Sequence, residues 1–304
     1  MTPTLLHFPA MRDPARRLAK ALEIPALEID LHRFPDGESL VRLPQPLTDI
    51  LILVSSMHPA NDRLTELGLA CETLAEAGHR VLLVLPYLCY MRQDKAFRSG
   101  EAVSQRIVGR WIARWGEALV TVDPHLHRTR RLTDAVPVAR ARVVSAAPLL
   151  GRHAAERWPE AVLLGPDEES AQWVRQAAAA GSLEWMVARK QRMGDREVHI
   201  RFPDRPELRN RTVVLIDDMS VTGRTLAEAA RLARERGARE VHALVTHALF
   251  AEDAIEAMRE AGVDEIASSD SLPHPTNRIH LDGVLAQAVR ELLAAESPFP
   301  GETP

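Results

Sequence analysis

The sequence predicts an α/β fold made of two halves, each a parallel sheet flanked by helices. Two observations lead to this fold class. Short apolar runs alternate with amphipathic segments along the whole chain. The alternation occurs twice with a similar layout, and the break falls near residues 143–148. We therefore expect domains at 1–144 and 145–304, with the last helix packing back on the first domain.

Length and composition agree with two domains. The chain has 304 residues, of which 46% are hydrophobic, so two cores can form. The formal net charge of −4 gives no sign of nucleic-acid binding. The two cysteines, Cys71 and Cys89, predict no disulfide framework. No run approaches about 18 apolar residues and no signal-peptide core opens the chain, so we expect a cytoplasmic protein without a membrane span.

In the first half, the spacing of apolar residues predicts three strands and three helices. In chain order they are a helix at 14–22, a strand at 50–54, a helix at 64–77, a strand at 80–85, a helix at 104–115 and a strand at 118–122.

The second half repeats this pattern with more elements. They are a helix at 146–157, a strand at 161–164, a helix at 169–179, strands at 183–187 and 213–216, a helix at 223–236, a strand at 240–246, a helix at 251–261, a strand at 265–268 and a helix at 281–294. The continuous apolar strands indicate a sheet that is covered on both faces.

The stretch VVLIDDMSVTGRTLAEAA (213–230) carries two aspartates where the predicted strand ends. Ligands of open parallel sheets bind at such carboxyl ends. Carboxylates there can accept hydrogen bonds from sugar hydroxyls or hold Mg²⁺. The following hydroxyls and the free N–H groups of a helix N-terminus suit a phosphate. The alternative is an ordinary strand end with Thr222 as the helix N-cap.

This stretch resembles the phosphoribosyl pyrophosphate (PRPP) binding motif of phosphoribosyltransferases and PRPP synthetases. The motif alone does not separate the two. The chain departs from it at Val221, where an acidic residue is frequent, and at Arg224, where a glycine is frequent. The resemblance implies that ribose 5-phosphate is bound by Asp217, Asp218, Ser220, Thr222, Gly223, Arg224 and Thr225.

The first half contains segments that resemble PRPP synthetases alone. HRFPDGESLVRLP (32–44) resembles their FxDGE segment, which implies that Phe34, Asp36 and Glu38 contact the adenine end of ATP. An aromatic face can stack on a purine, and acidic groups can accept from its amino group. The alternative is a plain turn, because Pro-Asp-Gly favours turns.

LPYLCYMRQDKAFRSGEAVS (85–104) resembles the PYxxYxRQD segment of the synthetases and the RSxE stretch that follows it. A guanidinium and an ammonium after a strand can clamp ATP phosphates. The alternative is a solvated charged loop. The resemblance implies ATP-binding roles for Arg92, Gln93, Asp94 and Lys95.

Two further segments resemble metal-binding parts of the family. In TVDPHLHR (121–128), His125 matches a histidine that binds the Mg²⁺ of MgATP or the triphosphate, and Asp123 would support it. In GPDEES (165–170), Asp167 matches an aspartate that holds a second Mg²⁺ near the ribose. Residues 168–170 replace a glycine-rich turn there, which argues against close diphosphate contacts at this turn.

ARKQRMGDREV (188–198) resembles the flexible catalytic loop of the synthetases. Lys190 and Arg192 match its two cations, which would stabilise charge on the transferred group. The alternative is a solvated basic face.

The motifs occur in family order over about residues 30–295, so the chain is identified as a member of the ribose-phosphate diphosphokinase (PRPP synthetase) family. The resemblance implies transfer of the diphosphoryl group of MgATP to the 1-hydroxyl of ribose 5-phosphate, giving PRPP and AMP for nucleotide biosynthesis. It also implies a homo-oligomer, because the FxDGE segment of one subunit serves its neighbour. A dimer and a hexamer, regulation by phosphate or ADP, and the choice of nucleotide donor stay open.

Three other functions compete with this one. A phosphoribosyltransferase needs only one α/β domain and none of the first-half motifs. A catalytically silent, regulatory PRPP-synthetase-like subunit usually lacks the metal histidine or the catalytic cations, which are present here. A diphosphokinase acting on a different phosphorylated sugar is the third.

Overall fold

A computed structural model describes residues 2–126, 128–192, 198–203 and 205–295, with backbone alone for 190–192 and 198–201. Among these residues, contacts separate two compact units. Unit 1 runs to Val144 and also takes up Ser271–Pro273 and the segment from Leu281. Unit 2 comprises Ser145–Asp270 and His274–His280.

Unit 1 is built on a six-stranded, all-parallel sheet in the order β2-β1-β5-β6-β7-β8. Its central strands are apolar and almost wholly buried, as expected when helices cover both faces. The strands are β1 (Thr4–His7), β2 (Ala26–Glu28), β5 (Ile50–Val54), β6 (Arg80–Leu85), β7 (Ala118–Val122) and β8 (Arg140–Val144).

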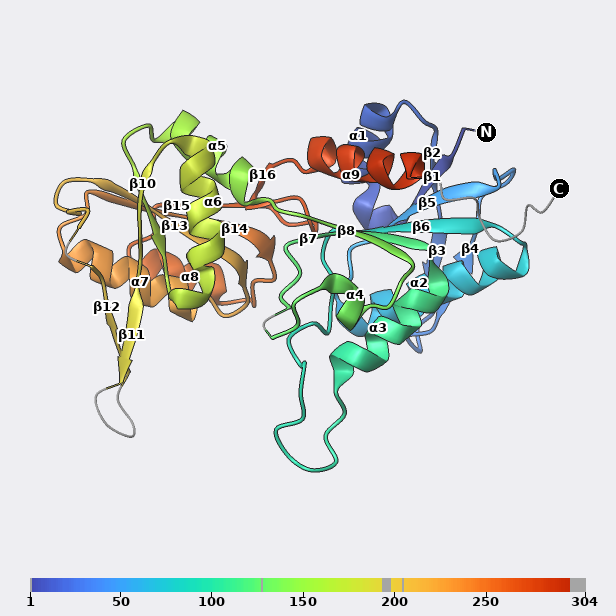
Figure 1. Cartoon of the computed structure of the whole chain (residues 1–304), viewed down its shortest axis with the longest axis horizontal. Coiled ribbons are helices and arrows are strands. Elements are labelled where there is room, and N and C mark those ends of the chain that lie inside the picture. Colours follow the sequence, from blue (N-terminus) through green and yellow to red (C-terminus); the bar gives the residue numbers. More distant parts are fainter. Residues whose placement is uncertain (1, 127, 193–197, 204, 296–304) are drawn as a thin grey trace. The chain divides into compact units, whose positions relative to one another are not determined.

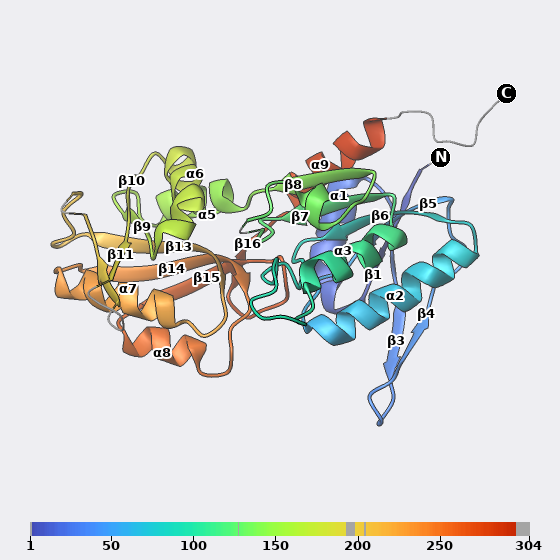
Figure 2. The same ribbon diagram turned by 60° about the horizontal axis from the view of Figure 1, so that its bottom comes forward.

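Helices cover both faces of this sheet (Figure 1). One face carries α1 (Arg12–Leu22) and α9 (Asp282–Ala294), which lie side by side in both views (Figures 1 and 2). The other face carries α2 (Ala60–Glu76), α3 (Ser104–Trp115) and the short α4 (Leu132–Ala135). The last helix thus packs on unit 1, where Arg140 Nη1 donates to the carbonyl of Leu292 at 2.8 Å.

A separate hairpin extends from unit 1 (Figure 2). Its strands β3 (Asp30–Arg33) and β4 (Ser39–Arg42) pair antiparallel and form a two-stranded sheet of their own. The turn between them carries the sequence FPDGE, residues 34–38.

Unit 2 contains the second six-stranded parallel sheet, in the order β10-β9-β13-β14-β15-β16. Its strands are β9 (Val162–Gly165), β10 (Glu184–Val187), β13 (Thr212–Ser220), β14 (Glu240–Ala248), β15 (Glu265–Ser269) and β16 (Asn277–Ile279). An antiparallel pair, β11 (Arg189–Arg192) and β12 (Val198–Arg201), stands apart from this sheet.

The helices of unit 2 also form two layers (Figure 1). One face of the sheet carries α5 (Ala147–Arg157) and α6 (Ala171–Gly181), and the other carries α7 (Arg224–Glu235) and α8 (Ala254–Glu260). The α/β class and the helical layers predicted from the sequence are therefore confirmed. Within the described part of the chain, no helix is both long enough and apolar enough to span a membrane.

Both sheets reverse their strand order at one place. In unit 1 the chain moves outward from β1 to β2 and resumes on the other side of β1 with β5. In unit 2 it moves from β9 to β10 and resumes beside β9 with β13. Ligands of open α/β sheets bind outside the carboxyl ends of the strands that flank such a reversal.

The prediction that the aspartate-bearing strand ends at residue 216 is wrong. Strand β13 runs on to Ser220, and Asp217, Met219 and Ser220 pair with Val245, His247 and Ala248 of β14. The ladder bonds of a sheet join backbone groups, so polar side chains do not end a strand at the ligand edge. Strands β1, β2, β8 and β16 of the two six-stranded sheets were not predicted, and all four lie at or next to a sheet edge.

Candidate active site

The turn from β13 into α7 forms a close-fitting loop at the carboxyl edge of the unit 2 sheet. Gly223 precedes the helix with φ +69°, and a Cβ at this position would lie 2.7 Å from the carbonyl oxygen of Ala254. Only glycine meets both conditions. Val221 O accepts from Ala251 N at 2.7 Å and holds the loop in place. The loop therefore presents the N-terminus of α7, with its free N–H groups, at this edge.

The two aspartates precede this loop at different depths. Asp218 is 3% exposed, whereas Asp217 is half-buried. The backbone N–H of Asp218 donates to Asp217 Oδ1 at 3.0 Å. Burial raises the pKa of Asp217 well above its ordinary value, and the charges of Asp218 and Asp167 raise it further. The carboxylates of Asp218, on the same strand, and Asp167, after β9, thus both act on Asp217.

Asp167 follows β9 and closes a single turn of 3₁₀ helix, Glu168–Ser170. Its Oδ1 accepts from the backbone N–H groups of Glu169 and Ser170 at 3.1 and 3.3 Å. None of residues 167–170 has a positive φ, so the turn needs no glycine. The N–H groups that a glycine-rich turn would offer to a diphosphate are here bonded to Asp167.

In unit 1, the segment after β6 carries the predicted phosphate-binding cations. Arg92 and Lys95 are exposed. Gln93 is held in place, because its Oε1 accepts from Ser104 Oγ at 2.6 Å. The Lys95 ammonium lies 4.8 Å from the centre of the Phe97 ring.

Asp94 differs from these neighbours because it is buried and bonded to Arg128. Arg128 donates to it from Nη1 at 3.1 Å and from its backbone N–H at 3.3 Å. Burial alone would raise the pKa of Asp94, but the charge and N–H groups of Arg128 outweigh it and hold the pKa below its ordinary value. The ion pair joins the segment after β6 to the segment after β7.

A buried glutamine joins the same two segments. Gln105 donates from Nε2 to the carbonyl of Met91 at 2.9 Å, and its Oε1 accepts from Thr129 Oγ1 at 2.8 Å. His125, predicted to serve the metal, is half-buried and lies three residues after the end of β7. The structure thus brings the predicted ATP residues 92–95 and His125 to one edge of unit 1.

The predicted adenine-binding residues lie on the turn between β3 and β4. Phe34 N donates to Glu38 O at 2.8 Å, and Gly37 N donates to Phe34 O at 2.9 Å. Asp36 Oδ1 accepts from Glu38 N at 3.1 Å. Phe34 is 39% exposed, so its ring has a face available. The segment is therefore a turn, as Pro-Asp-Gly favours, and this turn presents the side chains that an adenine site would use.

The predicted catalytic cations Lys190 and Arg192 lie on β11, where they pair with Ile200 and Val198 of β12. Their side chains lie outside the described residues, as does His127. In the part of the chain that is described, no group of three or more His, Cys, Asp or Glu residues is arranged to hold a metal ion by itself.

Sequence reasoning missed three side chains that organise these segments: Glu66, Gln105 and Arg128. Glu66 and Gln105 lie at buried helix positions, four residues before Ala70 and Gly109. A polar residue at an apolar position of a periodic helix signals a paired group, so this pattern could have revealed both.

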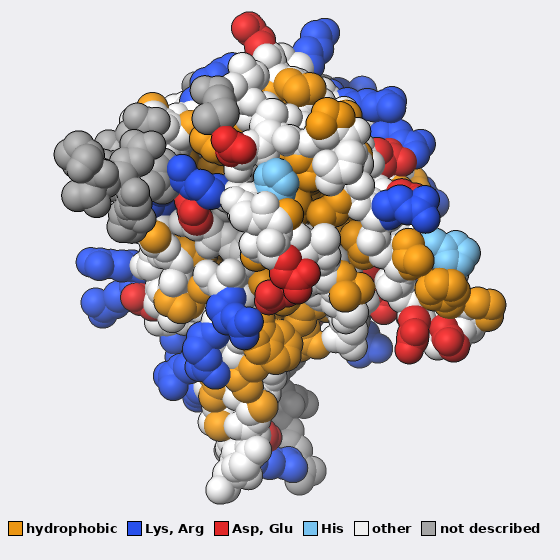
Figure 3. Space-filling model, turned by 90° about the vertical axis from the view of Figure 1, so that its right-hand side faces the viewer, with side chains coloured by type: hydrophobic (Ala, Val, Ile, Leu, Met, Phe, Trp, Pro, Cys, Tyr) orange, Lys and Arg blue, Asp and Glu red, His pale blue; other side chains and the backbone are white. Residues whose placement is uncertain are grey.

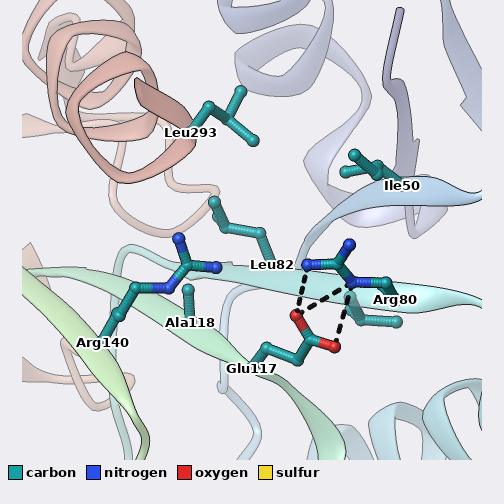
Figure 4. A pocket seen from close by; sticks show the side chains of 8 residues that line it. Ile50, Arg80, Leu82, Glu117, Ala118, Arg140 and Leu293 are labelled. Atoms are coloured by element: carbon teal, nitrogen blue, oxygen red, sulfur yellow. Dashed lines mark hydrogen bonds and ion pairs between the residues drawn. The ribbon is translucent and has the colours of Figure 1, made fainter. Parts of the chain in front are cut away.

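A cavity of about 40 Å³ in unit 1 lies away from these segments (Figure 4). It is found at the amino ends of the strands, beside Leu293 of α9, and contains the ion pair between Arg80 and Glu117 at 3.1 Å. None of the predicted site residues lines it. Its size and its place at the amino ends of the strands exclude it as the substrate site.

An open groove on unit 1 is lined by apolar side chains from α2 and α3. Leu69 and Trp111, which are 44% and 45% exposed, line it together with Trp115. Figure 3, viewed from the side of unit 1, shows exposed hydrophobic side chains among charged ones. The groove also contains none of the predicted site residues.

Comparison with known proteins supports the resemblance. The N-terminal domain of ribose phosphate pyrophosphokinase matches residues 4–116, and the phosphoribosyl transferase domain matches residues 144–271. A ribose-phosphate pyrophosphokinase of Methanopyrus kandleri is 37% identical over 91% of this chain and 95% of its own length. One from Thermococcus kodakarensis is 34% identical over 84% and 89%.

The fold agrees with these matches. The crystal structure of a phosphoribosylpyrophosphate synthetase from Mycobacterium smegmatis superposes with a TM-score of 0.80, covering 97% of this chain and all of that one at 24% identity. At this identity the superposition establishes the shared fold, and the sequence relatives establish the family. The chain belongs to the ribose-phosphate pyrophosphokinase family.

Proposed function

We propose that this protein is a ribose-phosphate diphosphokinase that converts MgATP and ribose 5-phosphate into PRPP and AMP. The observation that carries the proposal is the match of residues 4–116 to the N-terminal domain of this family. A phosphoribosyltransferase does not need this domain, whereas the motifs assigned to ATP all lie in it or just after it. The matched relatives extend over nearly the whole chain.

Ribose 5-phosphate binds at the carboxyl edge of unit 2. Asp217 and Asp218 accept hydrogen bonds from the ribose hydroxyls. The 5-phosphate is bound by the N–H groups of the loop and of the first turn of α7, together with the hydroxyls of the loop. The exposed Arg224 adds a positive charge beside it. The residues assigned to this site are Asp217, Asp218, Ser220, Thr222, Gly223, Arg224 and Thr225.

ATP binds to unit 1 residues. Phe34 stacks on the adenine, and Asp36 and Glu38 accept from its amino group. Arg92 and Lys95 contact the phosphates, and Gln93 donates from its amide. Asp94 acts through Arg128, which it holds by two hydrogen bonds.

The donor groups also fit Mg²⁺. Magnesium prefers carboxylate oxygens, water and substrate phosphates, and proteins usually hold it through one or two carboxylates. Burial and the negative charges of Asp218 and Asp167 raise the pKa of Asp217, and a cation bound nearby would offset these charges. Asp167 would hold the ion near the ribose and His125 the ion of MgATP. When bound, Mg²⁺ neutralises phosphate charge.

The protein's part in the reaction is to align the reactants and stabilise charge. The 1-hydroxyl oxygen forms a bond to the β-phosphorus. The bond from that phosphorus to the oxygen shared with the α-phosphorus breaks, and AMP leaves with this oxygen. The proton of the hydroxyl passes to solvent. Lys190 and Arg192 stabilise the negative charge on the transferred group.

We also infer a homo-oligomer, at least a dimer, in which the turn 34–38 of one subunit serves the ATP site of its neighbour. The cytoplasmic location stays a prediction.

A silent regulatory subunit is the second candidate, and one observation favours it. The turn after β9 carries Glu168 and Glu169 and offers no unbonded N–H from Glu169 or Ser170 to an anion. Because added carboxylates repel a diphosphate, this turn weakens the site relative to a glycine-rich one.

An assay of AMP release separates the two candidates. With Mg²⁺, ATP and ribose 5-phosphate, we expect AMP to appear in step with PRPP and no ADP. Lys190→Ala should lower kcat by about 10²- to 10³-fold, as removal of one charge-stabilising group does. Calorimetry should show that this variant still binds ribose 5-phosphate, and that Asp217→Asn with Asp218→Asn binds it more weakly. A purified wild-type chain that releases no AMP would support the silent subunit.

A further inference from the structure

The hairpin of β3 and β4 depends on unit 1 for its orientation. An isolated two-stranded hairpin is marginally stable in water at best. Most side chains of the two strands are exposed, and Leu31 and Val41 are the half-buried apolar residues that pack against the unit 1 core. These two contacts lie in the strands, away from the turn 34–38.

A carboxylate on α2 anchors the hairpin at the base of that turn. Glu66 is 0% exposed. It accepts from Arg33 Nη2 at 2.9 Å, from Ser39 Oγ at 3.2 Å and from Arg63 Nη1. Arg33 also reaches Asp62, one helical turn earlier on α2, at 3.0 Å. Arg33 and Ser39 belong to the hairpin, whereas Arg63 and Asp62 belong to α2.

The hairpin partners of Glu66 are the residues next to the turn. Arg33 is the last residue of β3, and Ser39 is the first residue of β4. Glu66 therefore binds the residue before the turn and the residue after it. Within the turn, the bonds from Phe34 to Glu38 and from Gly37 to Phe34 leave little internal freedom. Next to the turn, the hairpin is thus held on α2 mainly through one buried carboxylate.

Packing alone does not require a charge at this position. Replacing a buried ion pair by apolar residues is often neutral or stabilising, whereas removing one partner of the pair is strongly destabilising. A buried Glu with two arginines therefore points to a need for a fixed geometry.

We propose that Glu66 is a positioning residue for ATP: it holds the turn 34–38 in the orientation in which that turn contacts adenine. This inference rests on the proposed function, and specifically on the adenine role of the turn. Glu66 itself does not touch the substrate.

The first test measures the hairpin directly. In Glu66→Ala, backbone amides of residues 30–42 should exchange with deuterium at least about tenfold faster, since a loss near 1.4 kcal/mol gives this factor. Amides of β5 should be unchanged. Glu72→Gln is the matched control, because Glu72 lies on the same helix but accepts from Trp115 Nε1 and Arg114 Nη2 of α3. It should leave the hairpin's exchange unaltered.

The second test measures catalysis. Glu66→Ala should raise KM for ATP about tenfold, since a loss near 1.4 kcal/mol of binding gives this factor, and leave KM for ribose 5-phosphate unchanged. Glu66→Gln keeps one acceptor oxygen and should restore part of the ATP affinity. If Glu66→Ala does not fold, Arg33→Gln replaces an exposed side chain that pairs with Glu66. It should show the same selective effect on KM for ATP.

Three results would overturn the proposal. If deuterium exchange at residues 30–42 is unchanged in Glu66→Ala and in Arg33→Gln, Glu66 does not anchor the hairpin. If the KM values for ATP and ribose 5-phosphate change equally, the variants have lost structure in general. An unaltered KM for ATP in Phe34→Ala shows that the turn does not bind ATP, even though the enzyme is active. Failure of the proposed function is separate, because then the wild-type protein releases no AMP.

Discussion

At the scale of single residues, Asp217 has the most strongly perturbed carboxylate of the predicted sugar site. Burial raises its pKa, and the charges of Asp218 and Asp167 raise it further. Groups with shifted pKa values gather at functional sites, because burial and like charges are brought together there. The free protein therefore carries an unfavourable interaction that bound cation or sugar relieves.

This interaction predicts an opposite effect of Asp217→Asn on stability and on binding. The pKa of Asp217 is higher in the folded than in the unfolded protein, so its contribution favours folding at low pH and is lost as the pH rises through the folded-state pKa. Without ligand at pH 7–8, Asp217→Asn should therefore melt at a higher temperature than the wild type. The gain should be about 2–4 °C for each kcal/mol recovered. The difference should shrink as the pH falls towards about 4.

Asp264→Asn is the control for this experiment. Asp264 accepts from Arg234 Nη2 at 2.6 Å and from Val241 N at 2.8 Å, so its removal should lower the melting temperature at pH 7. A lower melting temperature for Asp217→Asn as well would contradict the account of the three carboxylates.

Residues that act through tertiary contacts were harder to predict than those in motifs. Asp217, Asp218 and Gly223 stand in one short stretch, so their types and order predict a phosphate and sugar site. The partners of Glu66 lie 33 and 27 residues away, on a hairpin that the sequence did not predict. A single sequence shows that a charge is unusual at such a position but does not show which residue pairs with it.

At the scale of elements, the predicted ligand segments lie at the strand-order reversal in one sheet and beside it in the other. The reversal in unit 2 lies between β9 and β13, and both strands lead into predicted site residues. In unit 1 the reversal lies between β1 and β5, but the predicted ATP segments follow β6 and β7. The segments assigned to ATP thus follow the next two strands of the unit 1 sheet, beyond the reversal.

The loop between β13 and α7 predicts a steep dependence on Gly223. Gly223→Ala adds a Cβ that would lie 2.7 Å from the carbonyl oxygen of Ala254, in a backbone conformation with positive φ. We expect it to lower the stability of unit 2 by about 1–3 kcal/mol. Affinity for ribose 5-phosphate should fall with it, because the loop must shift.

Denaturant unfolding and calorimetry on this variant measure the two effects. Gly283→Ala is the matched control, because its added Cβ meets nothing within 4 Å and lies inside a helix. This variant should be as stable as the wild type or slightly more stable. Wild-type binding by Gly223→Ala would show that the loop does not approach the phosphate.

Element prediction succeeded where burial is complete and failed at the edges. The runs 50–54, 80–85 and 118–122 lie in the middle of the first sheet, and their bounds coincide with β5, β6 and β7. The edge strand β2 has only three residues, all half-buried, so its sequence carries no clear pattern. The end of β13 was misjudged for a different reason, since the ligand edge requires polar side chains on a strand that is still paired.

At the scale of the whole molecule, the chain combines two units of similar architecture, to which we assign different substrates. Unit 1 carries the segments assigned to ATP, and unit 2 carries those assigned to the sugar phosphate. The family relatives match both. Duplication of a parallel α/β unit is visible in the sequence because each round repeats its strands and helices, whereas assembly with other subunits leaves no such pattern.

A mixture of two inactive variants tests the proposed sharing of the turn between subunits. Phe34→Ala lacks the adenine contact, and Lys190→Ala lacks a catalytic cation. Each homo-oligomer should be weakly active. In a hybrid, some sites combine an intact turn from the Lys190→Ala subunit with an intact β11 from the other subunit. Activity should therefore rise above that of either variant after joint refolding, and simple mixing without subunit exchange is the control. No gain in hybrids of proven mixed composition would contradict the sharing.

The central claim is that the diphosphoryl group moves from ATP to C1 of ribose 5-phosphate in one piece. Phosphorus NMR of the complete reaction follows every phosphate at once and tests this directly. The account predicts that the three ATP resonances decline while AMP and a sugar-linked diphosphate grow in equal amounts, and only when ribose 5-phosphate and Mg²⁺ are both present. Growth of ADP with a singly phosphorylated C1, or AMP with free diphosphate, would contradict it.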